Sequence, residues 1–315
     1  MKKGILFALA ACFVWGWIFV FPEFLTDFSV IELVWGRYLV YGGLSSLLFL
    51  RKGFGQVKRY PIHIWVLAIV FASVSSVFYY FGIVAVIRYA SAPVAVLIAG
   101  MTPMVVALYG NWHTKEVSYK ILIFPCLGIG IGLVLVNILE IDWSFSSGFL
   151  LHYILGMTAA ILGILGWSWY AVQNAHFLKR NPHILPLEWA NMIGMGTLFW
   201  TFVLTLFILA NKGSFSHLFS LTTGAFRYWV GVSILGIVCS WLACTLWNRA
   251  STYLPFSFMG TILIFETVFG LSFVLLYQKR LPTLFEATGF TFMMGGIVSF
   301  MYLFRREKKK ALAQR

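Results

Sequence analysis

Residues 252–277 read TYLPFSFMGTILIFETVFGLSFVLLY, and Glu266 is the only charged residue in this apolar stretch. A run of this length can cross the hydrocarbon core of a bilayer as a single helix. A carboxylate at bilayer depth costs about 2.5–3.5 kcal/mol even on the mildest insertion scale, and such groups usually face a cavity, a partner or a proton path. We therefore expect Glu266 to be functional; a structural glutamate that hydrogen-bonds to a neighbouring helix is the alternative.

The composition indicates that most of the chain lies in a membrane. Of the 315 residues, 61% are hydrophobic and 10% are charged, whereas soluble domains carry about 25% charged residues. The mean hydropathy is +0.88. Apolar stretches that are long enough to span a bilayer recur along the sequence. They predict an all-α, polytopic membrane protein with ten transmembrane helices, over residues 5–22, 30–50, 62–87, 91–112, 121–139, 147–175, 184–210, 227–249, 252–277 and 282–304.

The distribution of basic residues predicts the orientation in the membrane. Most of the 23 Lys and Arg residues fall in loops on the same side as the N-terminus. Cytoplasmic loops carry such an excess, so we expect both termini in the cytoplasm. The net charge of +13 then reflects this asymmetry and the basic tail at residues 305–315, which we expect to contact membrane lipids through their anionic headgroups. No nucleic-acid partner is expected, and the short loops favour a bacterial inner membrane.

The residues that carry enzyme or metal chemistry do not form a recognisable pattern. The four cysteines all fall inside predicted helices, and no histidine pairs with another ligand at metal-binding spacing. We therefore expect no metal site and no cofactor. There is no ATP-binding motif, no pair of intramembrane aspartates and no Ser–His pair, so the protein is not expected to be an enzyme. An integral membrane enzyme remains the least favoured alternative.

The sequence repeats itself weakly at one constant shift in residue number, which we call the repeat offset. This offset takes Tyr89 to Tyr253, Lys115 to Lys279 and Gly132 to Gly296, as well as Pro103 to Thr267. Five predicted helices then recur as five helices, and an odd number per repeat inverts the second copy in the membrane. Inverted repeats are typical of secondary transporters, with the substrate site between the repeats. We expect a first repeat at residues 1–140, a second at 141–304 and a tail at 305–315.

Several short motifs, in this order and at this spacing, resemble the drug/metabolite transporter superfamily and its EamA-type ten-helix members. The matching pieces are Ala10-Ala11-Cys12-Phe13-Val14-Trp15-Gly16, Arg37, Ala90-Ser91-Ala92, Thr102-Pro103-Met104, Glu116, Phe265-Glu266-Thr267-Val268-Phe269-Gly270, Gly289 and Gly295-Gly296. The resemblance covers essentially the whole chain. It implies that helices one to four and six to nine line a central cavity, with helices five and ten outside it.

Two positions are expected to act in gating. Pro103 should kink the fourth helix because it cannot donate a hydrogen bond to the carbonyl group of Ala99. Thr267 stands where the family usually has a proline in the ninth helix, and its hydroxyl can bend that helix more gently by bonding to Leu263. The two halves are therefore expected to gate unequally. Glycines stripe the fifth and tenth helices and allow close helix packing, through which a homodimer is one expectation.

Aromatic and polar side chains at midplane depth are candidates for the cavity wall. Trp and Tyr usually gather at the membrane interfaces, so deep ones are expected to face protein or water; for any single aromatic residue, ordinary core packing is an equal alternative. Arg37 is expected either to pair with an acid or to contact an anionic group of the substrate. The expected site comprises Glu266, Trp15, Trp17, Tyr79, Tyr80, Trp167, Trp169, Asn191, Trp247 and Arg37.

An acid surrounded by aromatic rings suits a cation or an amine. We therefore expect a secondary active transporter of small metabolites such as amino acids, amines or amphiphilic drugs. In this hypothesis proton and substrate compete for Glu266 while the halves alternate in access. A nucleotide-sugar or lipid flippase of the same fold is the alternative, although a phosphate group would favour more buried cations than Arg37 alone.

Overall fold

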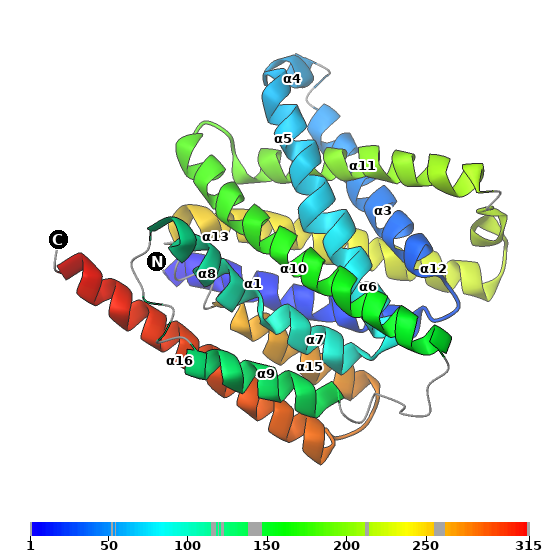
Figure 1. The fold of residues 1–315 in the computed structure, drawn as a ribbon. Helices are drawn as coiled ribbons and strands as arrows, with labels where there is room; N and C mark the ends of the chain where they lie inside the picture. The colour runs from blue at the N-terminus through cyan, green and yellow to red at the C-terminus, as the bar shows by residue number, and fades with distance from the viewer. Residues whose placement is uncertain are drawn as a thin grey trace.

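The computed structural model is a bundle of helices (Figure 1). It describes residues 2–51, 53, 55–114, 118, 120, 123–137, 147–211, 214–254 and 262–313. Within these residues the regular structure is helical and contains no strand, so the all-α class is confirmed. Glu116 and residues 255–261 of the expected ninth span lie outside the described part of the chain.

The described helices follow the order of the predicted spans. In the first part of the chain they are α1 (Lys2–Trp15), η1 (Gly16–Phe19), α2 (Phe21–Phe24), α3 (Val30–Leu50), α4 (Gly55–Lys58), α5 (Ile62–Ala72), η2 (Ser73–Phe78), α6 (Tyr79–Tyr89), α7 (Ala92–Gly100), α8 (Thr102–Thr114) and α9 (Ile123–Asn137). In the second part they are α10 (Ser147–Arg180), α11 (Pro186–Ala210), η4 (Ser216–Phe219), α12 (Thr223–Gly236), η5 (Ile237–Leu242), α13 (Ala243–Tyr253), α15 (Ile264–Tyr277) and α16 (Leu284–Ala313).

Length and apolar composition indicate which of these helices can cross a membrane. Among the described residues, seven stretches qualify: Lys2–Phe24, Val30–Leu50, Ile62–Tyr89, Leu150–Arg180, Pro186–Ala210, Thr223–Tyr253 and Leu284–Glu307. Shorter apolar helices at Ala92–Val106, Ile123–Gly132 and Ile264–Tyr277 fall where the fourth, fifth and ninth spans are expected. A polytopic membrane protein is thus confirmed, whereas the count of ten spans and the cytoplasmic termini stay predictions.

Short polar side chains fix where several helices begin. At the start of α3, the Ser29 hydroxyl accepts a hydrogen bond from the Glu32 N–H at 3.3 Å, and the Glu32 carboxylate accepts one from the Ser29 N–H at 2.7 Å. Ser91 caps α7 by accepting from the Val94 N–H at 3.4 Å. Pro93 follows at a position where its missing N–H costs little. Such caps satisfy backbone donors that the helix itself leaves without a partner.

Two long helices each contain a π-helical segment near the middle. η2 separates α5 from α6, and η5 separates α12 from α13. The two segments begin at Ser73 and Ile237, which the repeat offset relates to each other. A π-helical turn is rare and frequently marks a functional site.

The fourth span is interrupted between α7 and α8, at Met101. Pro103 follows the interruption and cannot donate to the carbonyl group of Ala99. The hydroxyl group of Thr102 donates to that carbonyl oxygen instead, at 2.6 Å. The kink expected at Pro103 thus coincides with a one-residue interruption at Met101, which separates α7 from α8.

The ninth span meets this interruption. Its described part, α15, starts next to a turn at Leu263, whose carbonyl oxygen accepts a hydrogen bond from the Glu266 N–H at 3.0 Å. Thr267 lies directly beside Gly100, because a methyl group added to Gly100 would come within 2.7 Å of the Thr267 hydroxyl oxygen. The unequal gating expected from Pro103 and Thr267 stays a prediction.

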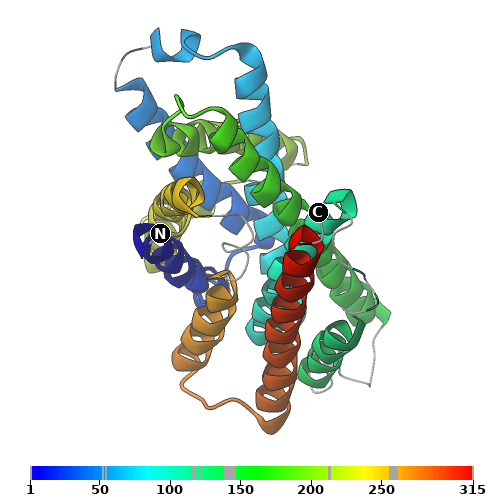
Figure 2. The same cartoon turned by 90° about the vertical axis from the view of Figure 1, so that its left-hand side faces the viewer.

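The helices of the first half pack against those of the second in matched pairs. α6 and α8 pack against α10, while α13 and α15 pack against α1. α3 packs against α11 and α12, and α11 also packs against α5. α7 contacts α15, and α9 lies along α16 in both views (Figure 1, Figure 2). Each of these pairings therefore has a counterpart in which the roles of the two halves are exchanged, or is its own counterpart.

Glycine allows α9 and α16 to approach closely. A methyl group added to Gly132 would lie 2.5 Å from the carbonyl oxygen of Gly289, and one added to Gly296 would lie 2.8 Å from the backbone of α9. Gly130 and Gly295 have no such neighbour within 4 Å. Most of the glycine stripe is thus used inside the chain, as close packing of small residues predicts. The homodimer expected through these helices stays a prediction.

The contrast between Gly132 and Gly130 provides a test of this packing. Gly132→Ala should destabilise the protein by about 1–3 kcal/mol, the usual cost of overpacking, because the backbone of α16 would have to move away. Gly130→Ala should be neutral or stabilising, because alanine favours the helix and meets no neighbour. The measurement is the thermal unfolding midpoint in detergent. Equal midpoints for the two variants would contradict the glycine contact.

Candidate functional site

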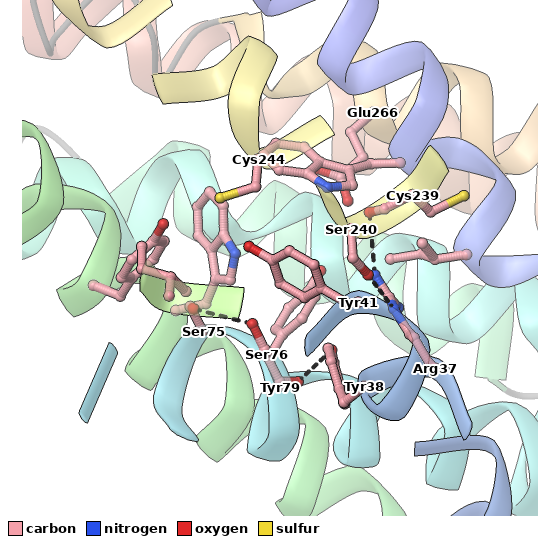
Figure 3. Close-up of a pocket in the computed structure, with 15 residues that line it drawn as sticks. Arg37, Tyr38, Tyr41, Ser75, Ser76, Tyr79, Cys239, Ser240, Cys244 and Glu266 are labelled. Atoms are coloured by element: carbon pink, nitrogen blue, oxygen red, sulfur yellow. Dashed lines mark hydrogen bonds between the residues drawn. The ribbon is translucent and has the colours of Figure 1, made fainter. Parts of the chain in front are cut away.

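A narrow cavity lies between helices of both halves, next to the two π-helical segments (Figure 3). Its volume is about 50 Å³. A cavity of this size has room for water but not for a metabolite, so a metabolite-sized ligand requires the walls to move. Its lining residues are Trp15, Ile18, Arg37, Tyr38, Tyr41, Ser75, Ser76, Tyr79, Trp167, Tyr170, Ile193, Cys239, Ser240, Cys244 and Glu266.

Glu266 is the acidic residue of this wall. It lies in the first turn of α15, where the helix dipole favours a negative charge. Within the described part of the chain, its carboxyl group forms no hydrogen bond and no ion pair with another side chain. An unpaired carboxyl group among apolar helices is unfavourable. The group is therefore available to take up a proton or a cation.

Arg37 is the basic residue of the wall and is only 5% exposed. Its Nε donates to the Ser240 hydroxyl at 2.8 Å, and its Nη2 donates to the Cys239 carbonyl at 3.2 Å. Its guanidinium group lies over the ring of Tyr80, with 4.0 Å to the ring centre. Nη1 is buried and has no hydrogen-bond partner among the described residues. Arg37 and Glu266 line the same cavity (Figure 3), and no ion pair joins these two side chains.

Tyrosine hydroxyls donate hydrogen bonds to backbone carbonyl groups around the cavity. Tyr38 donates to the carbonyl oxygen of Ser76 in η2 at 2.7 Å, and Tyr41 donates to that of Ala190 in α11 at 2.9 Å. Both tyrosines come from α3, three residues apart, so they share one face of that helix. α3 thereby supplies three cavity side chains, counting Arg37.

Tryptophan rings close another part of the cavity. The Trp15 ring lies 6.0 Å from that of Trp167 and 5.3 Å from that of Trp247, and the latter two are 6.1 Å apart. Tyr79 lies 6.1 Å from Trp167. These separations are typical of favourable aromatic pairs. Trp15, Trp167 and Tyr79 line the cavity, and Trp247 supports them from behind.

Five of the residues expected at the site do not line this cavity: Trp17, Tyr80, Trp169, Asn191 and Trp247. Tyr80 and Trp247 pack directly behind wall residues, whereas the other three lie elsewhere. Trp17 is 40% exposed and stacks on Phe273 on the outside of the bundle, with 4.6 Å between ring centres. Trp169 packs edge-on against Phe71 at 5.7 Å. Asn191 is buried and accepts a hydrogen bond from an indole N–H at 2.8 Å, so its amide oxygen is satisfied within the bundle. The side chains of Trp17, Trp169 and Asn191 therefore point away from the cavity.

Several of the lining residues were not predicted from the sequence, and they include Tyr38, Tyr41, Ser75, Ser76, Cys239, Ser240 and Cys244. Serine and cysteine are common in membrane helices, and nothing in their own stretches marks them. The one available signal is the repeat offset, which relates Ser76 to Ser240. The π-helical segments turn these two residues toward the cavity, and no apolar pattern indicates where such segments occur.

Polar contacts between the halves hold one end of the bundle together. The imidazole of His217 lies 2.7 Å from the Glu32 carboxylate, and the Gln278 amide donates to Glu23 at 2.7 Å. We call this the Glu32 end; α3 and α12 begin here, and α6 and α15 end here. Arg88, at the end of α6, donates to backbone carbonyl groups of residues 25–28 and fixes that loop against the bundle.

A second cluster holds the opposite end, which we call the Glu188 end. The Tyr60 hydroxyl donates to the Glu188 carboxylate at 2.8 Å, and Arg59 lies 3.8 Å from the same group. Burial and the neighbouring Glu188 raise the pKa of Tyr60 to about 12, so the hydroxyl remains a donor over the physiological range. The cavity therefore lies between two ends that are each tied across the halves.

Comparisons with known proteins agree with the fold and the sequence motifs. Residues 2–138 match the EamA-like transporter family. The Inner membrane protein YtfF of Escherichia coli (strain K12) is 30% identical over 305 residues, which are 95% of this chain and 94% of that protein. A solved crystal structure of 19% sequence identity covers 97% of this chain and 99% of its own, with a TM-score of 0.65, and shows the same fold. The chain belongs to the EamA-like transporter family, within the drug/metabolite transporter superfamily that its motifs resemble.

Proposed function

We propose that this protein is a proton-coupled secondary transporter of small amine-bearing metabolites in the inner membrane. One observation carries the proposal: Glu266 and the incompletely bonded Arg37 face one aromatic cavity without pairing with each other. Amino acids fit this arrangement best, since they carry an ammonium and a carboxylate group. Amines and amphiphilic drugs would use the acidic side of the cavity alone. The family itself points to transport rather than to an enzyme.

The acidic side of the cavity suits an ammonium group. Glu266 provides a negative charge, and the faces of Trp15, Tyr79 and Trp167 lie around the same space. Aromatic faces attract cations by about 0.5–2 kcal/mol, more where water is excluded. Together the charge and the rings favour a small organic cation over an anion of the same size.

Proton coupling follows from competition for one group. The Glu266 carboxyl group can hold a proton or pair with an ammonium group, and nothing else in the described wall provides a second acid. A proton that binds from one side then displaces the substrate toward that side. This exchange needs no further charged residue, which agrees with a cavity that contains one acid.

Alternating access is supported by the relation between the halves. The π-helical segments recur at the repeat offset. The helix pairs between the halves named above also correspond: α6 packs on α10 as α13 packs on α1. We propose two inverted repeats, at residues 1–140 and 141–304, followed by the tail at 305–315. Rocking of the repeats would open the Glu32 end and the Glu188 end in turn.

A flippase for nucleotide sugars or lipids is the second candidate of this fold. Sites that bind a phosphate group usually contain several Arg or Lys side chains, and arginine often contacts the phosphate in a bidentate geometry. Arg37 is the only basic residue that the described cavity wall contains. The single cation, together with the acid, favours an ammonium-bearing substrate over a phosphorylated one.

The inverted repeat predicts the position of each loop. Alkaline phosphatase fused after Asn181 follows six spans and should be inactive, whereas a fusion after Ser216 follows seven spans and should be active outside. Green fluorescent protein fused after Arg315 should fluoresce, because the C-terminus is expected in the cytoplasm. An active phosphatase at Asn181 would contradict the proposed topology.

Transport in proteoliposomes tests the function. Uptake of a panel of amino acids, amines and nucleosides should be saturable for one class and should rise with an imposed pH gradient. Glu266→Gln should lower the pH-driven flux by at least about tenfold, because an amide cannot exchange a proton. Glu307→Gln is the matched control: this residue lies in the tail of α16 and pairs with Lys310 at 2.8 Å, an exposed contact that contributes little.

The outcomes of this assay separate the parts of the proposal. A substrate flux that does not change with the pH gradient would support transport but contradict proton coupling. Normal pH-driven flux in Glu266→Gln would remove the proposed role of Glu266. An absence of flux for the whole panel, with lipid movement in its place, would favour the flippase.

A further inference from the structure

Neighbouring residues of α3 bond to the two π-helical segments. The Tyr38 hydroxyl donates to the carbonyl oxygen of Ser76 in η2, within the first half. Arg37 donates to the Ser240 hydroxyl and to the Cys239 carbonyl in η5, which belongs to the second half. α3 thus connects the π-helical segment of its own half to that of the other half at one point of the cavity wall.

The connection through Arg37 is a continuous chain of polar contacts in an apolar setting. The Ser240 hydroxyl that accepts from Arg37 donates in turn to the Leu235 carbonyl in α12 at 2.9 Å. The ring of Tyr80 covers the guanidinium group from the α6 side. The charged group is thereby held between α3, α6 and η5, and the halves cannot separate here without breaking its bonds.

The charge of Arg37 is not neutralised by these partners. Ser240 and Cys239 are neutral acceptors, and within the described residues no carboxylate lies at ion-pairing distance. Nη1 has no acceptor at all among these residues. A buried charge without a counter-ion is unfavourable. A carboxylate that enters the cavity could accept from Nη1 and Nη2 together, the geometry that arginine prefers, and would draw Nη2 away from η5.

Arg37 lies on the side of the cavity nearer the Glu32 end. It comes five residues after Glu32 on α3, one helical turn before Tyr41. The tryptophan cluster lies on the other side, since Asn248, next to Trp247, approaches the Pro186 carbonyl near the Glu188 end. Release of Arg37 would therefore loosen the Glu32 side of the cavity while the tryptophan rings still close the opposite side.

We propose that Arg37 is a latch that ties α3 of the first half to η5 of the second half and closes the cavity toward the Glu32 end. The carboxylate of a zwitterionic substrate releases this latch by taking the place of the η5 acceptors. The release step rests on the proposed transport function, whereas the latch itself can be tested without a substrate. In this proposal Arg37 both recognises the substrate and controls access to it.

The latch is tested by the reactivity of a native thiol in the cavity. Cys244 lines the same wall, so its modification by a membrane-impermeant thiosulfonate reports opening. Right-side-out and inverted vesicles are treated with the reagent, and the labelled peptide is quantified by mass spectrometry. Ser240→Ala removes one acceptor of Arg37 and should accelerate labelling by about tenfold from the side of the Glu32 end, because hydrogen bonds to charged groups are among the stronger ones. Labelling from the other side should not change.

Ser272→Ala is the matched control. The Ser272 hydroxyl donates within its own helix to the Val268 carbonyl at 2.8 Å and lies on the exposed face of α15. This variant should be labelled at the wild-type rate. Equal rates for Ser240→Ala, Ser272→Ala and the wild type would overturn the latch, as would acceleration from the side of the Glu188 end only.

A pair of probes that differ by one carboxylate tests the release step. L-Phenylalanine and phenethylamine share the ring and the ammonium group, and only the former can bond to Arg37. The wild type should move phenylalanine in preference to phenethylamine, and Ser240→Ala should reduce this preference, because its latch is already open. Equal movement of both probes in the wild type would overturn release by the carboxylate. An absence of flux for both would contradict the proposed function and the release step with it, while the labelling rates would still decide the latch.

Discussion

The hydrocarbon core of a bilayer offers no hydrogen bonds to a polypeptide backbone, so a spanning segment must satisfy its own N–H and C=O groups. The described spans do so as helices, except at a few interruptions. Two interruptions are the π-helical segments η2 and η5, and a third is the break at Met101. The cavity lies next to the two π-helical segments, and side chains from α3 bond to carbonyl groups in both of them. The site thus occurs where regular helix is lost.

The sequence predicted the positions of the spans well because apolar length is a strong signal in membrane proteins. It also pointed to Glu266 and Arg37, since a charge inside an apolar run is unfavourable unless it has a use or a partner. Its weaker part was the orientation of side chains. Trp17 and Trp169 lie close in sequence to the wall residues Trp15 and Trp167, yet they face away from the cavity. The depth of a residue in the membrane follows from its position along the chain, whereas the direction in which its side chain points depends on how the helices pack.

The proposed repeats share a backbone pattern but differ in their chemistry. At the repeat offset, Glu266 corresponds to Thr102 and Arg37 corresponds to Thr201. Each half therefore contributes one charge to the described cavity wall, and each charge has a hydroxyl-bearing residue as its counterpart. Ser76 and Ser240 are the same in both halves, at the π-helical segments where the backbone departs from the regular helix. In this arrangement a symmetric framework encloses an asymmetric site, which gives a dipolar ligand one preferred orientation.

The acceptors around the cavity belong largely to the backbone. Tyr38, Tyr41 and Arg37 each donate to a carbonyl oxygen on another segment, at Ser76, Ala190 and Cys239. A carbonyl group persists whatever side chain its residue carries, so a new donor on α3 can use an acceptor that already exists. The lining can consequently change one residue at a time without a compensating change across the interface. Such a wall is easy for evolution to modify, and one scaffold of this kind can diversify into transporters with different cargoes.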